Sequence, residues 1–180
     1  MTAELPGDWR PLEPGDARAW ADLLAAIQAA DGGWQYVTEQ ALLAGFDHPQ
    51  RDFGRGSAAI WDGGSLAGYG LITVRPAADP VHEIVYAGGV HPGYRGRGLG
   101  TWLLDWAQRA AVPLHQERFA GRPMALLAAC PSAGAAAMGL FAARLPARAA
   151  LPRDAARSHD RTACRAGHGA AGHGHRPAHP

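Results

Sequence analysis

Four glycines and two arginines occupy positions 93–100, within the stretch VHPGYRGRGLGTWLLDW at residues 90–106. This turn constrains the fold most, because glycine disfavours both strand and helix interiors. A strand that ends in such a turn and leads into a helix leaves the first N–H groups of that helix unpaired, in a field that favours anions. The stretch predicts a strand–turn–helix unit that binds phosphate, with Arg95 and Arg97 adding charge-assisted hydrogen bonds. A tight turn with solvated arginines is the alternative.

The spacing of the glycines separates this turn from better-known phosphate loops. Glycines at 96, 98 and 100 do not fit G-x-G-x-x-G, and no Gly-Lys-Ser/Thr follows. The pattern Arg/Gln-x-x-Gly-x-Gly/Ala does fit, on Arg95, Gly98 and Gly100. With VHPGY before it and an amphipathic helix after it, the segment resembles the acetyl-CoA-binding motif of the GNAT superfamily of N-acetyltransferases, and it is similar to actinobacterial members. The resemblance covers roughly residues 8–144.

The order of the other elements agrees with that resemblance. Apolar spacing predicts helices at 17–31 (capped by Asp16), 37–46 (capped by Thr38), 100–112 (ended by Pro113) and 132–144, and a loop at 47–56. Strands are predicted within 8–16 and at 57–61, 66–74, 81–90 and 124–130, with a hairpin turn at Asp62-Gly63. We expect an α/β (α+β) domain of the GNAT acyl-CoA N-acyltransferase fold, in which helices flank a central mixed sheet.

The resemblance implies a role for each residue of the turn. The backbone near Gly89 and Val90 is expected to pair with the pantetheine arm of acetyl-CoA, and the acetyl thioester to lie where the strands at 82–90 and 124–130 diverge. The amides after Val90 are expected to hold the pyrophosphate. The implied cofactor-binding residues are Gly89, Val90, Arg95, Gly96, Arg97, Gly98, Leu99, Gly100 and Thr101.

Acetyl transfer from a thioester to an amine needs a base, a donor for the oxyanion, and a proton for the departing thiolate. Glu83 is the candidate base, because in several GNAT enzymes a glutamate at similar spacing takes this role, often through water; an exposed or ion-paired strand carboxylate is the alternative. The Val90 amide is the implied oxyanion donor. Many relatives carry an acidic tyrosine on the last helix, but this chain has Phe141 there, and a phenyl ring donates no proton.

The pattern stops near residue 145. GNAT chains usually continue into Gly-Phe and two more strands, but this sequence has Leu145-Pro146, and those strands do not follow. We expect a GNAT domain at 1–145 and an Arg/Ala/His-rich disordered tail at 146–180. A frameshift is one explanation, since a neighbouring reading frame can encode Gly-Phe there; a natural disordered tail is the other.

Composition limits the partners. The formal net charge is +1 and every basic residue is arginine, which gives no electrostatic reason to expect nucleic acid or an anionic membrane. Two distant cysteines and a histidine-bearing tail suggest no functional metal site, and without a signal peptide or an apolar run of about 18 residues we expect a cytoplasmic protein. The expected acceptor is an amine of a small molecule or peptide, and a homodimer is left open. The alternatives are a non-catalytic or degenerate acyl-CoA-binding protein, and a nucleic-acid-binding tail.

Overall fold

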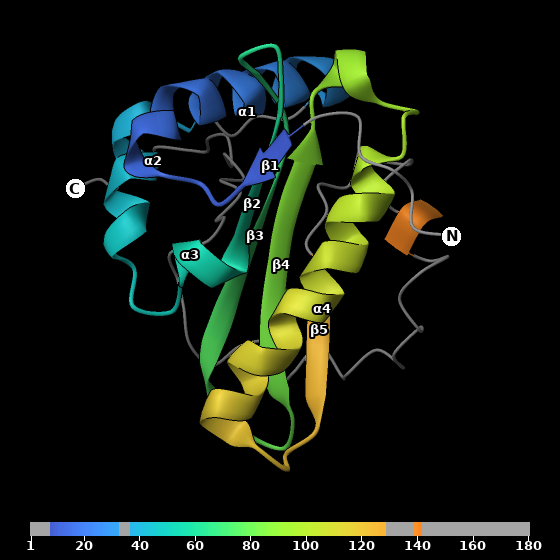
Figure 1. Cartoon of the computed structure of the whole chain (residues 1–180). Coiled ribbons are helices and arrows are strands. Elements are labelled where there is room, and N and C mark those ends of the chain that lie inside the picture. Colours follow the sequence, from blue (N-terminus) through green and yellow to red (C-terminus); the bar gives the residue numbers. More distant parts are fainter. Residues whose placement is uncertain (1–7, 33–36, 129–138, 142–180) are drawn as a thin grey trace, which may run out of the picture. The chain divides into compact units, whose positions relative to one another are not determined.

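The structure, a computed structural model, describes residues 8–32, 37–128 and 139–141. In these ranges five strands form one sheet in the order β1-β2-β3-β4-β5 (Figure 1). The first four strands are antiparallel, and β5 runs parallel to β4. The strands are β1 (Asp8–Arg10), β2 (Ser57–Asp62), β3 (Ser65–Ala78), β4 (His82–Val90) and β5 (Met124–Ala128), and the helices are α1 (Ala17–Asp31), α2 (Glu39–Ala44), α3 (Phe53–Gly56) and α4 (Leu99–Phe119).

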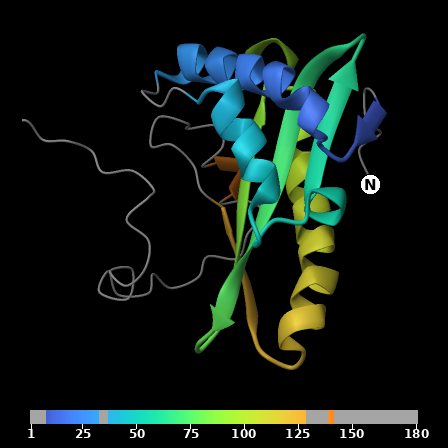
Figure 2. The ribbon, with the colours of Figure 1, turned by 90° about the vertical axis from the view of Figure 1, so that its left-hand side faces the viewer.

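The two faces of the sheet carry separate apolar clusters. On one face α4 packs Leu103 and Leu104 against Ile72 and Ile84. On the other face α1 and α2 pack around Leu71 (Figure 2). Each strand supplies both faces because neighbouring side chains point to opposite sides. The expected mixed sheet flanked by helices is therefore confirmed.

Several local predictions are confirmed. Helix α1 has the predicted bounds and ends at Gly32, which adopts φ +73°. The hydroxyl of Thr38 accepts a hydrogen bond from the N–H of Ala41 at 3.2 Å and so caps α2. The hairpin forms as β2 and β3, joined by a turn at Gly63 and Gly64. These elements carry their stop and turn signals within a few residues of sequence.

Helix α4 does not end at Pro113, as the sequence predicted, but continues to Phe119. A proline inside a helix costs about 3 kcal/mol. The last two turns offset that cost by burying Leu114 and His115, and Glu117 pairs with Arg55 of α3. Burial of one leucine side chain contributes about 1.5–3 kcal/mol. Packing therefore overrides the local signal of Pro113.

Two further predictions are wrong in detail. The predicted loop at 47–56 contains the short helix α3, which begins because the carboxylate of Asp52 accepts a hydrogen bond from the N–H of Arg55 at 3.0 Å. Asp16 makes no cap hydrogen bond to α1. A 3₁₀ turn at Pro14–Asp16 leads directly into α1. The Asp16 carboxylate instead accepts a hydrogen bond from the N–H of Glu13, which precedes it in the chain.

The other C-terminal predictions fall largely outside the described residues. Of the predicted helix at 132–144, residues 139–141 are described and are helical. The segment 146–180, and with it the frameshift hypothesis, lies outside the described ranges. Across the described ranges, no helix has the length and apolar character needed to span a membrane.

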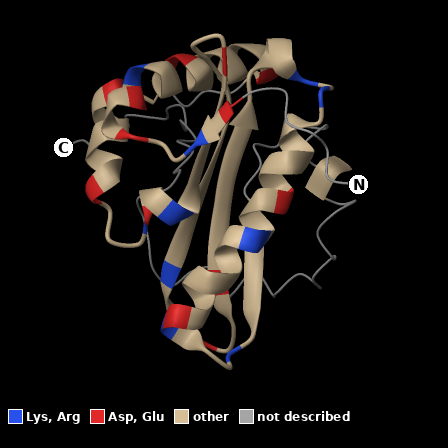
Figure 3. Cartoon of the chain, viewed as in Figure 1, with Lys and Arg blue, Asp and Glu red and all other residues tan. Residues whose placement is uncertain are grey.

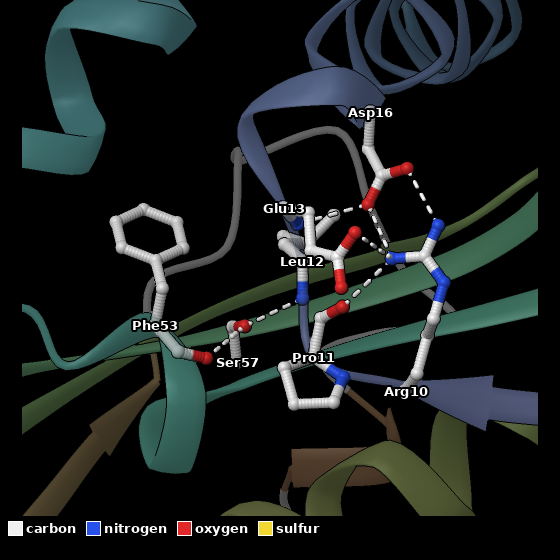
Figure 4. A network of polar contacts seen from close by, with 7 residues as sticks. All are labelled: Arg10, Pro11, Leu12, Glu13, Asp16, Phe53 and Ser57. Carbon is white, nitrogen blue, oxygen red and sulfur yellow. Dashed lines mark hydrogen bonds and ion pairs between the residues drawn. The ribbon is translucent and has the colours of Figure 1, made fainter.

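The Asp16 carboxylate ties the first strand to the first helix (Figure 4). It accepts two hydrogen bonds of 2.7 Å from the guanidinium of Arg10 and one of 2.9 Å from the N–H of Glu13. Burial opposes ionisation of this carboxyl, but the hydrogen bonds from Arg10 and Glu13 and the charge of Arg10 outweigh burial and lower its pKa. Beside this network, the Ser57 hydroxyl accepts from the N–H of Leu12 and donates to the carbonyl of Phe53.

Asp16→Asn should lower the free energy of unfolding by about 1–3 kcal/mol, because the charge-assisted bonds to Arg10 are lost inside a half-buried site. Urea denaturation at pH 7 measures this change. Asp47→Asn, at an exposed carboxylate, is the matched control and should change the free energy little. Equal losses in both variants would contradict a structural role for the network.

Two buried imidazoles meet where β4 packs on α4. Nδ1 of His82 lies 2.8 Å from Nδ1 of His115, and the Nε2 atoms lie 3.1 Å from the carbonyl oxygen of Arg75 and 3.0 Å from that of Arg122, respectively. A carbonyl only accepts, so each Nε2 carries a proton and the Nδ1 pair shares one more at most. A second shared proton would place two cations side by side. Burial, with the charges of His115 and Arg118, lowers the pKa of His82.

The unfolded chain can protonate His82 at its ordinary pKa, whereas the folded chain holds that pKa lower. The free energy of unfolding should therefore fall as pH drops below about 6.5, by up to about 1.4 kcal/mol per pH unit for one proton of difference. Urea denaturation between pH 7.5 and pH 5 measures the slope. A His82→Gln/His115→Gln double variant should lose most of it, and His48→Gln, at a half-buried loop histidine, should keep it. An unchanged slope in the double variant would contradict the assignment.

Candidate active site

The candidate site lies at the last residues of β4. Strand β4 pairs with β3 along its length, as far as Val90. Its described pairing with β5 covers only the first five residues and ends at Tyr86 opposite Ala128. Beyond this point Gly88 is exposed, although it lies on an inner strand of the sheet. The last part of β4 therefore presents backbone at an open edge.

The register decides which backbone groups face that edge. The N–H of His91 donates to the carbonyl of Ala67 at 2.9 Å, which makes the odd-numbered residues of β4 the ones bonded to β3. The N–H and C=O groups of Gly88 and Val90 accordingly point to the β5 side. The sequence predicted backbone contacts around Gly89 and Val90. The structure directs the backbone of Gly89 to Tyr69 instead, and directs that of Val90 to the open edge.

Gly89 has a different function in the structure. A Cβ there would lie 2.6 Å from the Cδ1 atom of Ile27 in α1. A side chain there would require the end of Ile27 to shift, so glycine lets α1 lie close to β4 with Ile27 in its present position.

The turn after β4 adopts a conformation suited to glycine. Gly96 and Gly98 have φ of +77° and +84°, and open space surrounds the position of a Cβ on Gly96. The first bonded amide of α4 is that of Trp102, which donates to the carbonyl of Gly98 at 3.0 Å. The N–H groups of the preceding residues, Leu99, Gly100 and Thr101, find no carbonyl of the helix in range. The turn therefore presents consecutive N–H groups at the positive end of α4.

The arginines of the turn have partners within the chain. The guanidinium of Arg95 bonds both carboxylate oxygens of Asp31, at 2.8 and 2.9 Å, and its Nε donates to the carbonyl of Val90 at 3.4 Å. The guanidinium of Arg97 lies 5.0 Å from the ring centre of Tyr94. Sequence reasoning missed Asp31, which lies 64 positions before Arg95 and carries no local signal. Elsewhere acidic and basic residues are interspersed along the described chain (Figure 3).

The helical residues 139–141, the last ones that the structure describes, flank the start of α4. A Cβ on Gly100 would lie 3.4 Å from Leu140 Cδ2 and 3.9 Å from Val90 Cγ2. Leu140 and Phe141 also pack against the apolar cluster under α4. The ribbon of residues 139–141, coloured orange, is drawn beside α4 (Figure 1). The open edge of β4, the glycine turn and residues 139–141 thus lie together on the α4 side of the sheet.

Glu83 lies on the opposite side. It shares its face with Gly89, which contacts α1, whereas His82, Ile84 and Tyr86 are buried toward α4. It is the only carboxylate of β4 and lies three residues, about 10 Å, before the end of the β4–β5 pairing. His91 caps the next turn, since its Nδ1 accepts a hydrogen bond from the N–H of Gly93 at 3.1 Å. The described residues contain no cluster of three or more metal-ligating side chains.

A strand that leads into a glycine turn and a helix start is an arrangement that suits anions such as phosphate. Residues 20–132 match the Acetyltransferase (GNAT) family. The chain therefore belongs to the GNAT family of acetyltransferases.

Individual relatives agree with this assignment. Over 95 residues the chain is 40% identical to the mycothiol acetyltransferase of Thermobispora bispora, an alignment that covers 51% of this chain and 28% of that protein. It is similar to the structure of a GCN5-related N-acetyltransferase from Sphaerobacter thermophilus, with a TM-score of 0.64 and 27% identity over 74% of this chain and 41% of that one. An aminoglycoside N-acetyltransferase solved in complex with CoA shares the fold, with a TM-score of 0.55 and 15% identity over 83% and 98% of the two chains.

Proposed function

We propose that this chain is an acetyl-CoA-dependent N-acetyltransferase that acts on a primary amine of a small molecule or a peptide. The observation that carries the proposal is the glycine turn after β4, which leaves the first N–H groups of α4 without helical partners. Family membership supports the reaction class, and a relative of the same fold was solved with CoA. The chain spans 28% of the mycothiol acetyltransferase that it matches, so the acceptor is proposed only as an amine.

The turn fits the phosphates of acetyl-CoA. The amides from Arg95 to Thr101 would bind the pyrophosphate, and those of Leu99, Gly100 and Thr101 have no helical partner because they open α4. The Val90 N–H, which faces the open edge, would donate to the oxyanion of the tetrahedral intermediate. The outer N–H groups of Arg95 remain available to a phosphate even while Asp31 is bound.

Glu83 is proposed as the general base. It faces the α1 side of the sheet, and no other residue of β4 on that side can accept a proton from an amine. Its distance from the open edge means that the proton passes through water. The amine nitrogen attacks the carbonyl carbon of the thioester, its proton passes to Glu83, and collapse of the intermediate breaks the C–S bond.

Gly96→Ala tests the phosphate turn. A Cβ at φ +77° strains the backbone by about 1–2 kcal/mol without a steric clash. Gly64→Ala is the matched control, since Gly64 has φ +85°, equally open surroundings and a place in the β2–β3 turn. Both variants should lose similar thermal stability, but only Gly96→Ala should lose the rise in melting temperature that acetyl-CoA produces. Equal acetyl-CoA responses in the two variants would argue against the turn as the phosphate site.

Glu83→Gln tests the base. Release of free thiol from acetyl-CoA in the presence of an amine acceptor should fall about 100-fold or more, the effect typical of a lost general base. The rise in melting temperature with acetyl-CoA should be unchanged. Glu39→Gln, at an exposed carboxylate of α2, should leave the rate unchanged. An undiminished rate in Glu83→Gln would exclude Glu83 as the base. Thermal stabilisation of the wild-type chain by acetyl-CoA, with no thiol release for any amine, would favour a non-catalytic acyl-CoA-binding protein.

A further inference from the structure

We propose that the phenol of Tyr86 is the general acid that protonates the departing CoA thiolate. The inference rests on the proposed acetyl-transfer function and completes it, because Phe141, beside the site, has no proton to give. No other donor for this step is evident among the side chains of β4 that face α4, since His82 is bonded to His115 and to the carbonyl of Arg75.

The position of the hydroxyl carries the inference. A Cβ on Gly88 would lie 2.1 Å from the Tyr86 Oη atom and 2.5 Å from its Cζ atom. The phenol therefore extends along β4 from the last residue paired with β5 and places its oxygen over Gly88. Gly88 is exposed while the side chain of Tyr86 is 4% exposed. The ring is thus buried, and its hydroxyl lies against Gly88, the exposed residue near the end of β4.

Tyr86 also lies on the side of the sheet that α4 and the phosphate turn occupy. Tyr86 packs in the apolar cluster under α4, as do Leu140 and Val90, which flank the start of that helix. The phosphate turn opens onto the same face, so CoA approaches from the side of Tyr86. Glu83 lies three residues earlier and therefore on the other face. The donor of one proton and the acceptor of the other stand on opposite sides of the strand.

The environment keeps the phenol protonated. Burial, with the nearby phenol of Tyr69, raises the pKa of Tyr86. None of the described residues forms a hydrogen bond with its hydroxyl, so the O–H is available to a sulfur atom.

The proton balance closes without another reactant. When the C–S bond breaks, its electron pair goes to sulfur, and sulfur takes the proton from the Tyr86 oxygen. The tyrosinate regains a proton from water, and Glu83 releases to water the proton that it took from the amine. The net products are the acetylated amine and CoA with a free thiol.

Tyr86→Phe keeps the ring and removes only the oxygen. It should lower kcat about 100-fold, at the low end of what a positioned general acid contributes, and leave the KM for acetyl-CoA unchanged. Tyr69→Phe is the comparison variant, because Tyr69 is a second tyrosine of the sheet whose pKa burial raises to about 12, and it packs with the α1 cluster. Since Tyr69 acts on Tyr86 only through its charge, its loss should lower kcat far less than Tyr86→Phe does. Phe141→Tyr in the Tyr86→Phe background, which returns a hydroxyl to the same cluster, should recover part of the rate.

A binding measurement separates this inference from the proposed function. Calorimetry compares CoA with an analogue in which hydrogen replaces the thiol. The wild-type chain should bind CoA more tightly, and Tyr86→Phe should abolish the difference. If Tyr86→Phe abolishes the preference for the thiol but the wild-type chain releases no thiol with any amine, then Tyr86 lies at the sulfur and the proposed acetyl transfer is rejected. An unchanged kcat in Tyr86→Phe, an unchanged preference for the thiol, or no CoA binding by the wild-type chain would each overturn the inference.

Discussion

The site depends on the unequal pairing of one strand. Strand β4 is held by β3 as far as Val90, whereas its described pairing with β5 ends at Tyr86. The antiparallel partner keeps the end of β4 straight and fixes which N–H groups face outward. Gly88, whose backbone groups point away from β3, is exposed, and these groups are the ones proposed to meet a ligand. A longer β4–β5 ladder would satisfy the same groups internally and close the site.

In the proposed mechanism, alternation along β4 divides the chemistry between two faces. Tyr86 and Gly88 face the α4 side, which carries the phosphate turn, and Glu83 faces the α1 side. An odd separation in a strand always places two side chains on opposite faces. A thioester at the edge of β4 can therefore be attacked from one face and lose its thiolate on the other. A shift of either residue by one position would move both proton-transfer groups to the same face.

The sequence predicts the parts of this arrangement that have local causes. Helix α1, the Thr38 cap, the β2–β3 hairpin and the glycine turn follow from signals a few residues long. The passage of α4 through Pro113 could not be predicted, because it depends on burial of Leu114 and on contacts with α3. The positions of the catalytic candidates could not be predicted either. The closeness of the Tyr86 oxygen to Gly88 is a matter of side-chain rotamer, and the only sequence hint is two adjacent glycines inside a strand.

The ion pair between Arg95 and Asp31 connects the α4 side of the sheet to the α1 side. Arg95 belongs to the phosphate turn, and Asp31 is the last residue of α1, which packs on the other face. Two N–H groups of the guanidinium bind Asp31 and its Nε reaches Val90, so two N–H groups remain for a phosphate. A phosphate bound there would share the Arg95 guanidinium with the carboxylate of Asp31. Each of these two anions would hold the guanidinium in the orientation in which it binds the other. The end of α1 is thereby held in a position that depends on the same arginine as the phosphate turn.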